Sequence, residues 1–205
     1  MRRRDLARIV CVLPLLVAAV PETLPRIRGR FIEVGDELIV EFSLPEIIPL
    51  DDPAAVAAVD SGFATRLTFE LSLRAEGRQK PVSNVSYEAR LSWDPWNHRY
   101  LVTWPATGES RRFDSREAAV RRATTIRASL GPCAALARGR QAVHFLHIVA
   151  HRNPYTNAQR TGTGARGHDR DLSVFARWVS VFLGAPPRAE LTVERRTNAF
   201  YLVQR

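Results

Sequence analysis

The stretch from residue 60 to residue 104 carries the clearest pattern of the chain, an alternation of apolar and polar side chains. The apolar positions of its two long runs are Leu67, Phe69, Leu71, Leu73, Val85, Tyr87, Ala89, Leu91 and Trp93. Successive side chains of a β-strand point to opposite faces, so this period of two predicts strands with one buried and one solvated face. Turn residues at 94–97 then predict a third strand over Arg99–Trp104.

Shorter strands are predicted on both sides of this stretch. Residues 27–34 and 38–44 flank Gly35 and Asp36, a dipeptide typical of a tight hairpin turn. Near the C-terminus, apolar residues alternate again within residues 190–203, which predicts a final strand or hairpin.

Three segments have the pattern of helices. The first begins after Asp52, a preferred N-cap residue, and ends at Gly62. The second begins with a capping box of Asp114 and Glu117. Its apolar positions at helical spacing extend the predicted helix to residue 130 and are Ala119, Ala123, Ile126 and Leu130. The third covers residues 171–183.

These elements predict an α+β, mainly β fold, an antiparallel β-sandwich-like domain with two or three packed helices. We expect residues 20–205 to form a single domain. Within it, residues 153–170 combine glycines with threonines and arginines and are predicted to form a flexible surface loop.

The N-terminus has the order of a secretory signal. Four arginines among the first eight residues precede the apolar run 9–20, and small residues at 17–19 fit signal peptidase. Residues 1–19 are therefore predicted to be a signal peptide, and the protein is expected in the periplasm or secreted. The apolar run is too short to span a bilayer, so we expect no transmembrane anchor after cleavage. A core helix of a cytoplasmic protein is the alternative interpretation, and Sec and twin-arginine export both stay open.

The formal net charge is +9, of which the first nineteen residues contribute +3, leaving +6. Lys80 is the only lysine, so the basic character is almost entirely arginine. Six arginines lie in or just before the second predicted helix, namely Arg111, Arg112, Arg116, Arg121, Arg122 and Arg127. They fit either a solvated helix face or a patch for nucleic acid or an anionic surface. Because export removes the protein from nucleic acid, we expect no nucleic-acid partner.

An aromatic cluster surrounds the turn at residues 94–97. Its candidate binding residues are Trp93, Trp96, His98 and Tyr100. Such a cluster usually closes the edge of a core, and the alternative is a platform for a carbohydrate or another ligand.

His144, His147 and His151 are the candidate metal ligands. On a helix they would share a face, as a zinc site requires. The surrounding residues are β-branched and aromatic, which favours a strand, and on a strand His144 points opposite to the other two. Nucleophile-elbow, zinc-protease and phosphate-loop motifs are missing, so we predict no catalytic residues and no cofactor.

The order of elements is similar to a known family. A helix that closes in Asp-Ser-Gly-Phe-Ala-Thr at 60–65 is followed by a strand and then by Arg-Leu-Ser-Trp-Asp-Pro-Trp-Asn-His-Arg-Tyr at 90–100. These motifs resemble the exported proteobacterial family known as domain of unknown function 4390. Asn153-Pro154 and the apolar segment 175–183 are similar to its deltaproteobacterial members, whereas the long glycine- and arginine-rich loop between them departs from the pattern.

The resemblance covers most of the chain after the signal and implies a secreted or periplasmic domain without assigned catalytic residues. Genes of such proteins often neighbour envelope sensor kinases, which implies a sensing or accessory role. We therefore expect an exported, non-enzymatic binding or accessory domain, whose partner is an unknown envelope protein or a small ligand. The alternatives are a metal-dependent enzyme that uses the three histidines and an arginine-rich binder of nucleic acid or anionic surfaces.

Overall fold

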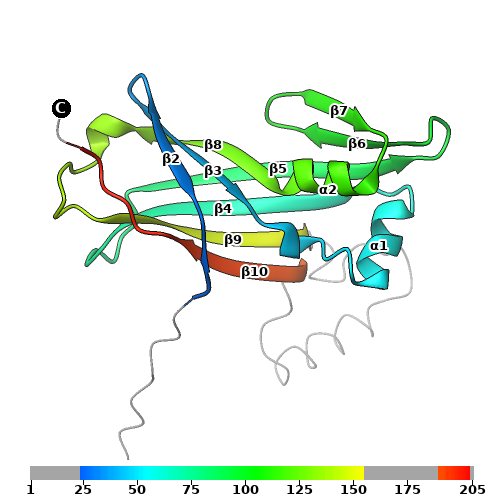
Figure 1. Ribbon diagram of the computed structural model, residues 1–205, viewed down its shortest axis with the longest axis horizontal. Coiled ribbons are helices and arrows are strands. Elements are labelled where there is room, and N and C mark those ends of the chain that lie inside the picture. The colour runs from blue at the N-terminus through cyan, green and yellow to red at the C-terminus, as the bar shows by residue number, and fades with distance from the viewer. Residues whose placement is uncertain (1–23, 155–188, 204–205) are drawn as a thin grey trace, which may run out of the picture.

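The computed structural model describes residues 24–154 and 189–203, which form two β-sheets that face each other (Figure 1). The larger sheet has the strand order β1-β10-β9-β4-β5-β6-β7, and the smaller has the order β2-β3-β8. The strands are β1 (Arg26–Ile27), β2 (Arg30–Val34), β3 (Glu37–Ser43), β4 (Thr65–Ala75), β5 (Ser83–Asp94), β6 (Arg99–Trp104), β7 (Glu109–Phe113), β8 (Thr125–Pro132), β9 (His144–Pro154) and β10 (Ala189–Thr197). The predicted signal peptide, most of the predicted loop and the predicted helix over 171–183 lie outside the described residues.

The larger sheet is built on the alternating stretch. Strand β4 pairs antiparallel with β5 on one side and with β9 on the other, and β5 continues into β6 and β7. The predicted strands of this stretch are confirmed, and β6 has the predicted bounds. Among the strands that the structure describes, β1 and β10 are the one parallel pair. The prediction of a mainly β, sandwich-like α+β fold is confirmed.

The smaller sheet begins with the predicted hairpin. Strands β2 and β3 pair antiparallel on either side of Gly35, whose φ of +62° is a conformation that glycine adopts without strain. Strand β8 then pairs with the other edge of β3, so that Val40 lies opposite Ala128. This sheet covers one face of the larger sheet (Figure 1).

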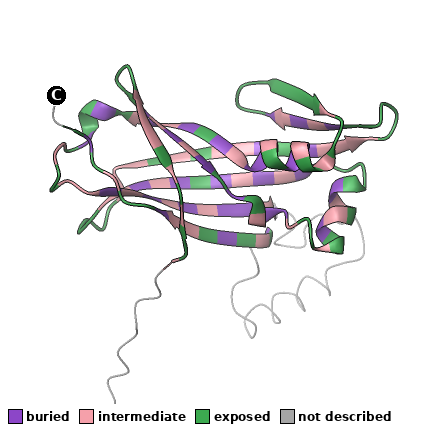
Figure 2. Cartoon of the chain, in the orientation of Figure 1, coloured by how far each residue is buried: buried purple, intermediate pink, exposed green. Residues whose placement is uncertain are grey.

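The core lies between the two sheets, where the apolar faces of the larger and the smaller sheet pack against each other (Figure 2). Phe69 is among the largest side chains that are almost completely buried, and the smaller sheet contributes Leu38 and Ile126. Burial of a single side chain of this size is worth about 2 kcal/mol, so the facing sheets stabilise each other mainly through apolar contact.

The predicted helix over 114–130 is wrong in its second half. Helix α2 (Arg116–Thr124) is capped by Ser115 and not, as predicted, by Asp114. The Ser115 hydroxyl accepts a 3.2 Å hydrogen bond from the N–H of Ala118. The chain then becomes strand β8. The residues around the change are the β-branched Thr124, Thr125 and Ile126, and pairing with β3 buries alternate side chains of β8.

The short helix after Asp52 is confirmed as α1 (Pro53–Asp60), and an Asp52 carboxylate oxygen accepts a 2.9 Å hydrogen bond from the N–H of Ala54. Two 3-10 turns complete the described elements, η1 (Pro45–Ile47) and η2 (Cys133–Ala135). Helix α1 lies at one end of the larger sheet, near the β5–β6 turn (Figure 1). Among the described residues, no helix is both long and apolar enough to cross a membrane.

Candidate functional site

The β5–β6 turn is held by Asp94. One carboxylate oxygen accepts hydrogen bonds of 3.0 and 3.2 Å from the backbone N–H groups of Trp96 and Asn97, and the other accepts a 2.7 Å bond from the Asn97 amide. The bond from the Asn97 side chain is the main reason that the pKa of Asp94 lies below its ordinary value. His98 follows with a φ of +49°, a left-handed conformation uncommon outside glycine. The turn therefore has a specific conformation imposed by local hydrogen bonds.

The structure brings together three of the four aromatic candidates and separates the fourth. The ring centroid of Trp93 lies 4.6 Å from that of Tyr100 and 6.1 Å from that of His98. Tyr100 is buried, whereas Trp96 is 91% exposed and has no ring contact within the part of the chain that the structure describes. Trp93 and Tyr100 thus pack against each other at the base of the turn, and Trp96 projects from the turn into solvent.

A polar cluster that the sequence did not predict supports the same turn. The Tyr100 hydroxyl donates a 2.8 Å hydrogen bond to Asp60, the last residue of α1. The Arg116 guanidinium lies 3.4 Å from the same carboxylate oxygen. Burial is the main cause that raises the pKa of Tyr100, and the hydrogen bond with Tyr100 is the main cause that raises the pKa of Arg116. These contacts join β6, α1 and α2.

Phe63 adds a second exposed aromatic side chain at this end. It is 81% exposed and follows Gly62, whose φ of +83° allows the sharp exit from α1. A Cβ atom at Gly62 would lie 4.0 Å from the carbonyl oxygen of Trp93, so the α1–β4 connection lies against the end of β5. Figure 1 shows this connection and the β5–β6 turn at the same end of the sheet. We call Phe63, Trp93, Trp96, His98 and Tyr100 the aromatic end.

Phe63 and Trp96 are the two most exposed large apolar side chains of the described residues. Exposed aromatic side chains on a fixed backbone are suited to binding, because they bury large areas at a small cost in side-chain entropy. Both Asp94 carboxylate oxygens accept hydrogen bonds within the turn, which fixes the backbone that carries Trp96. The geometry of this end is therefore that of a contact surface.

The three histidines lie on strand β9, as the β-branched and aromatic residues around them predicted. His144 is buried on the core side, where its Nε2 donates a 3.0 Å hydrogen bond to the Ala137 carbonyl. His147 and His151 lie on the other face, near Glu194 at 2.5 Å and near the Thr192 hydroxyl at 3.0 Å. Among the described residues there is no group of three or more histidines, cysteines and carboxylates that could hold a metal ion. The predicted triad is therefore divided between two faces.

The predicted basic face is also divided. Arg111 belongs to β7 and pairs with Glu109 at 2.7 Å, and Arg127 belongs to β8 and lies 3.4 Å from Glu41. The Arg122 guanidinium lies 4.0 Å from the ring centroid of the buried Trp104, a cation–π contact. These arginines have partners within the protein, which leaves less basic charge for an anionic surface.

Comparison of the chain with family models, with curated proteins and with solved structures finds no match. The resemblance to domain of unknown function 4390 therefore stays a prediction.

Proposed function

We propose that the protein is an exported, non-enzymatic binding or accessory module that contacts an envelope partner through the aromatic end. The observation that carries the proposal is the joint exposure of Phe63 and Trp96, at 81% and 91%, on two adjoining connections at one end of the sandwich. Exposed apolar side chains gathered in this way typically mark an interaction site, whereas scattered ones do not.

The backbone that carries the exposed side chains of the aromatic end is held in place by hydrogen bonds. The Asp94 turn fixes the backbone of Trp96, and the Tyr100–Asp60 bond fixes β6 against α1. A preorganised surface loses less entropy on binding than a mobile one. The export pattern of residues 1–19 and the resemblance to an exported family support an envelope partner and a role beside envelope sensing.

Crosslinking in intact cells tests the proposal. A photoreactive residue at position 96 or 63 is expected to give the same discrete adduct. The matched control is position 90 of β5. Arg90 is exposed like Phe63 and Trp96, but it does not belong to the aromatic end. Equal adducts at positions 90 and 96, or none at either, contradict the assigned surface. A substrate turned over by the pure protein, and lost on a point substitution, contradicts the non-enzymatic role.

A further inference from the structure

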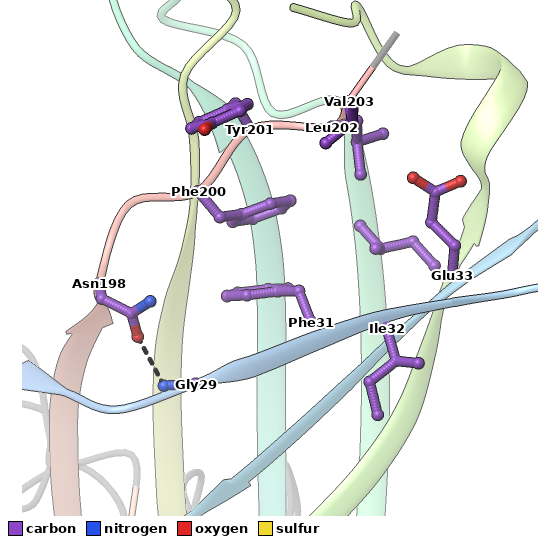
Figure 3. A pocket seen from close by; sticks show the side chains of 10 residues that line it. Gly29, Phe31, Ile32, Glu33, Asn198, Phe200, Tyr201, Leu202 and Val203 are labelled. Carbon is purple, nitrogen blue, oxygen red and sulfur yellow. Dashed lines mark hydrogen bonds between the residues drawn. The ribbon is translucent and has the colours of Figure 1, made fainter. Parts of the chain in front are cut away.

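A hollow lies at the opposite end of the sandwich, between β2 and the C-terminal segment over residues 198–203 (Figure 3). Its volume is about 470 Å³. Phe31 of β2 and Phe200 of the C-terminal segment stack with ring centroids 3.7 Å apart, and Figure 3 shows the two rings lying face to face. Leu38 and Leu202 add to an apolar lining. The hollow thus joins an aromatic floor to the edge of a sheet.

The wall of the hollow is the open edge of β2. Strand β2 is the end strand of the smaller sheet, so within the described residues a strand pairs with only one of its edges. The N–H of Gly29, just before β2, points away from β3 and donates a 2.7 Å hydrogen bond to the side-chain carbonyl of Asn198. Backbone groups of alternate residues point the same way along a strand, so the N–H and C=O of Phe31 also face the hollow.

The register of the β2–β3 hairpin independently shows that the backbone groups of Phe31 point away from β3. Val34 and Glu37 flank the two-residue turn and form its closing hydrogen-bonded pair, which makes Ile32 and Ile39 the next such pair. Phe31, opposite Val40, is then a residue whose backbone groups point outward. The side-chain carbonyl of Asn198 accepts from Gly29 as the backbone carbonyl of a neighbouring strand would. The hollow begins beside Phe31, where the next residue of such a strand would pair with β2.

Charge is distributed unequally along this edge. Arg28 and Arg30 are exposed at its N-terminal end. Arg28 forms no ion pair among the described residues, and the guanidinium of Arg30 lies 3.9 Å from Glu41. Asp36 and Glu37 are exposed at the hairpin end. Within the hollow, Glu33 is engaged by Arg138 through bonds of 3.1 and 3.3 Å. The edge is therefore basic at one end and acidic at the other.

We propose that the β2 edge binds an extended segment of a partner protein, which adds to the smaller sheet antiparallel to β2. Alternate apolar side chains of the segment lie on the Phe31–Phe200 stack, and its C-terminal end, next to Arg28 and Arg30, carries acidic residues. Antiparallel addition places that end beside the arginines, whereas parallel addition would place it beside Asp36 and Glu37. Main-chain hydrogen bonds supply affinity in such strand addition, and side-chain pockets and charges supply specificity.

Synthetic peptides test the mode of binding. The first probe is a terminally blocked peptide in which valine and threonine alternate and which ends in two aspartates. The second has the same composition with the aspartates at its N-terminal end. The third is the first probe with alternate amides N-methylated, which removes their N–H donors. Titration calorimetry is expected to show that the first binds about tenfold more tightly than the second, and that N-methylation in one of the two alternate patterns abolishes binding.

A charge-reversal variant tests the assigned end. Both Arg28 and Arg30 are exposed, so Arg28→Glu with Arg30→Glu is expected to fold and to weaken the first probe about tenfold. The control Arg111→Glu with Arg112→Glu changes the net charge equally on the distant β7 and is expected to leave binding unchanged. Equal binding of the first two probes, indifference to N-methylation, equal effects of the two variants, or no binding of any probe overturns the proposal. A protein that is already dimeric through β2 overturns it as well, because a second copy then occupies the edge.

Discussion

The Tyr100 hydroxyl donates a 2.8 Å hydrogen bond to Asp60, and this bond ties strand β6 to the end of helix α1. Asp60 also lies 3.4 Å from Arg116 at the start of α2. Three separate elements thus meet next to Phe63 and Trp96, the two most exposed aromatic side chains of the described residues. The polar cluster positions the aromatic end.

Removal of the Tyr100 hydroxyl tests this support. Tyr100→Phe is expected to lower the free energy of unfolding by about 1 kcal/mol, because a partly buried hydrogen bond is lost and Asp60 keeps Arg116 as a partner. Urea denaturation measures the change. The control is Tyr201→Phe, since Tyr201 is 47% exposed and its hydroxyl makes no hydrogen bond within the described residues. Equal changes in the two variants would show that the Tyr100–Asp60 bond does not stabilise the fold.

Substitution of Trp96 and of Trp104 is expected to have different effects on the free energy of unfolding, because only Trp104 belongs to the core. Trp96 is 91% exposed, so Trp96→Ala should change the free energy of unfolding by less than about 0.5 kcal/mol. Trp104 is buried beneath Arg122, so Trp104→Ala should cost about 3–5 kcal/mol. Denaturation curves measure both values. A large loss of stability in Trp96→Ala would assign Trp96 to the fold and not to a contact surface.

The Asp94 turn is expected to open in acid. Hydrogen bonds to the ionised carboxylate lower the pKa of Asp94 below 3.8, so they stabilise the turn above that pH and are lost as the pH falls through the lowered pKa. Amide chemical shifts of Trp96 and Asn97 should follow this titration with a midpoint below 3.8. The step should vanish in Asp94→Asn, which cannot titrate. A midpoint above 3.8 in the unmodified protein would show that these bonds do not favour the ionised form.

Arg138 is expected to hold the C-terminal segment in place. Its guanidinium bonds both Glu33 carboxylate oxygens and donates a 2.9 Å hydrogen bond to the carbonyl of Val203. Arg138→Ala should lower the free energy of unfolding more than loss of an exposed ion pair does, because Arg138 bonds both Glu33 carboxylate oxygens and the Val203 carbonyl. The exposed pair of Arg111 and Glu109 is the control, and Arg111→Ala should cost less than about 1 kcal/mol. The Gly139 N–H donates a 2.8 Å hydrogen bond to the Leu202 carbonyl of this segment. Hydrogen exchange at Gly139 should quicken only in Arg138→Ala, and unchanged exchange there would contradict the assigned role.

Period-two patterning was sufficient to predict β4, β5 and β6, because one face of each strand is buried and the other is solvated. It failed for β7, whose residues Glu109–Phe113 are mostly exposed and carry no alternation. It also failed for β8, since Ile126 and Leu130 satisfy helical spacing and strand alternation equally well. The pairing with β3 that decides between them comes from residues more than 80 positions away.

The aromatic turn was predicted because Trp93 and Tyr100 are close in sequence and lie opposite each other in the β5–β6 hairpin. Asp60, Phe63 and Arg116 reach the same site only through tertiary structure, and no local signal marked them. The division of the histidines was predictable from strand geometry, since His144 differs from the other two in its parity along β9.

The mass of the protein recovered from fractionated cells tests whether this domain acts outside the cytoplasm as a binding module. We expect a periplasmic or secreted protein whose mass corresponds to a chain that begins near Val20. A protein that retains Met1 and stays in the cytoplasm would contradict an exported binding module. That result would exclude an envelope partner for the aromatic end and favour an arginine-rich nucleic-acid binder.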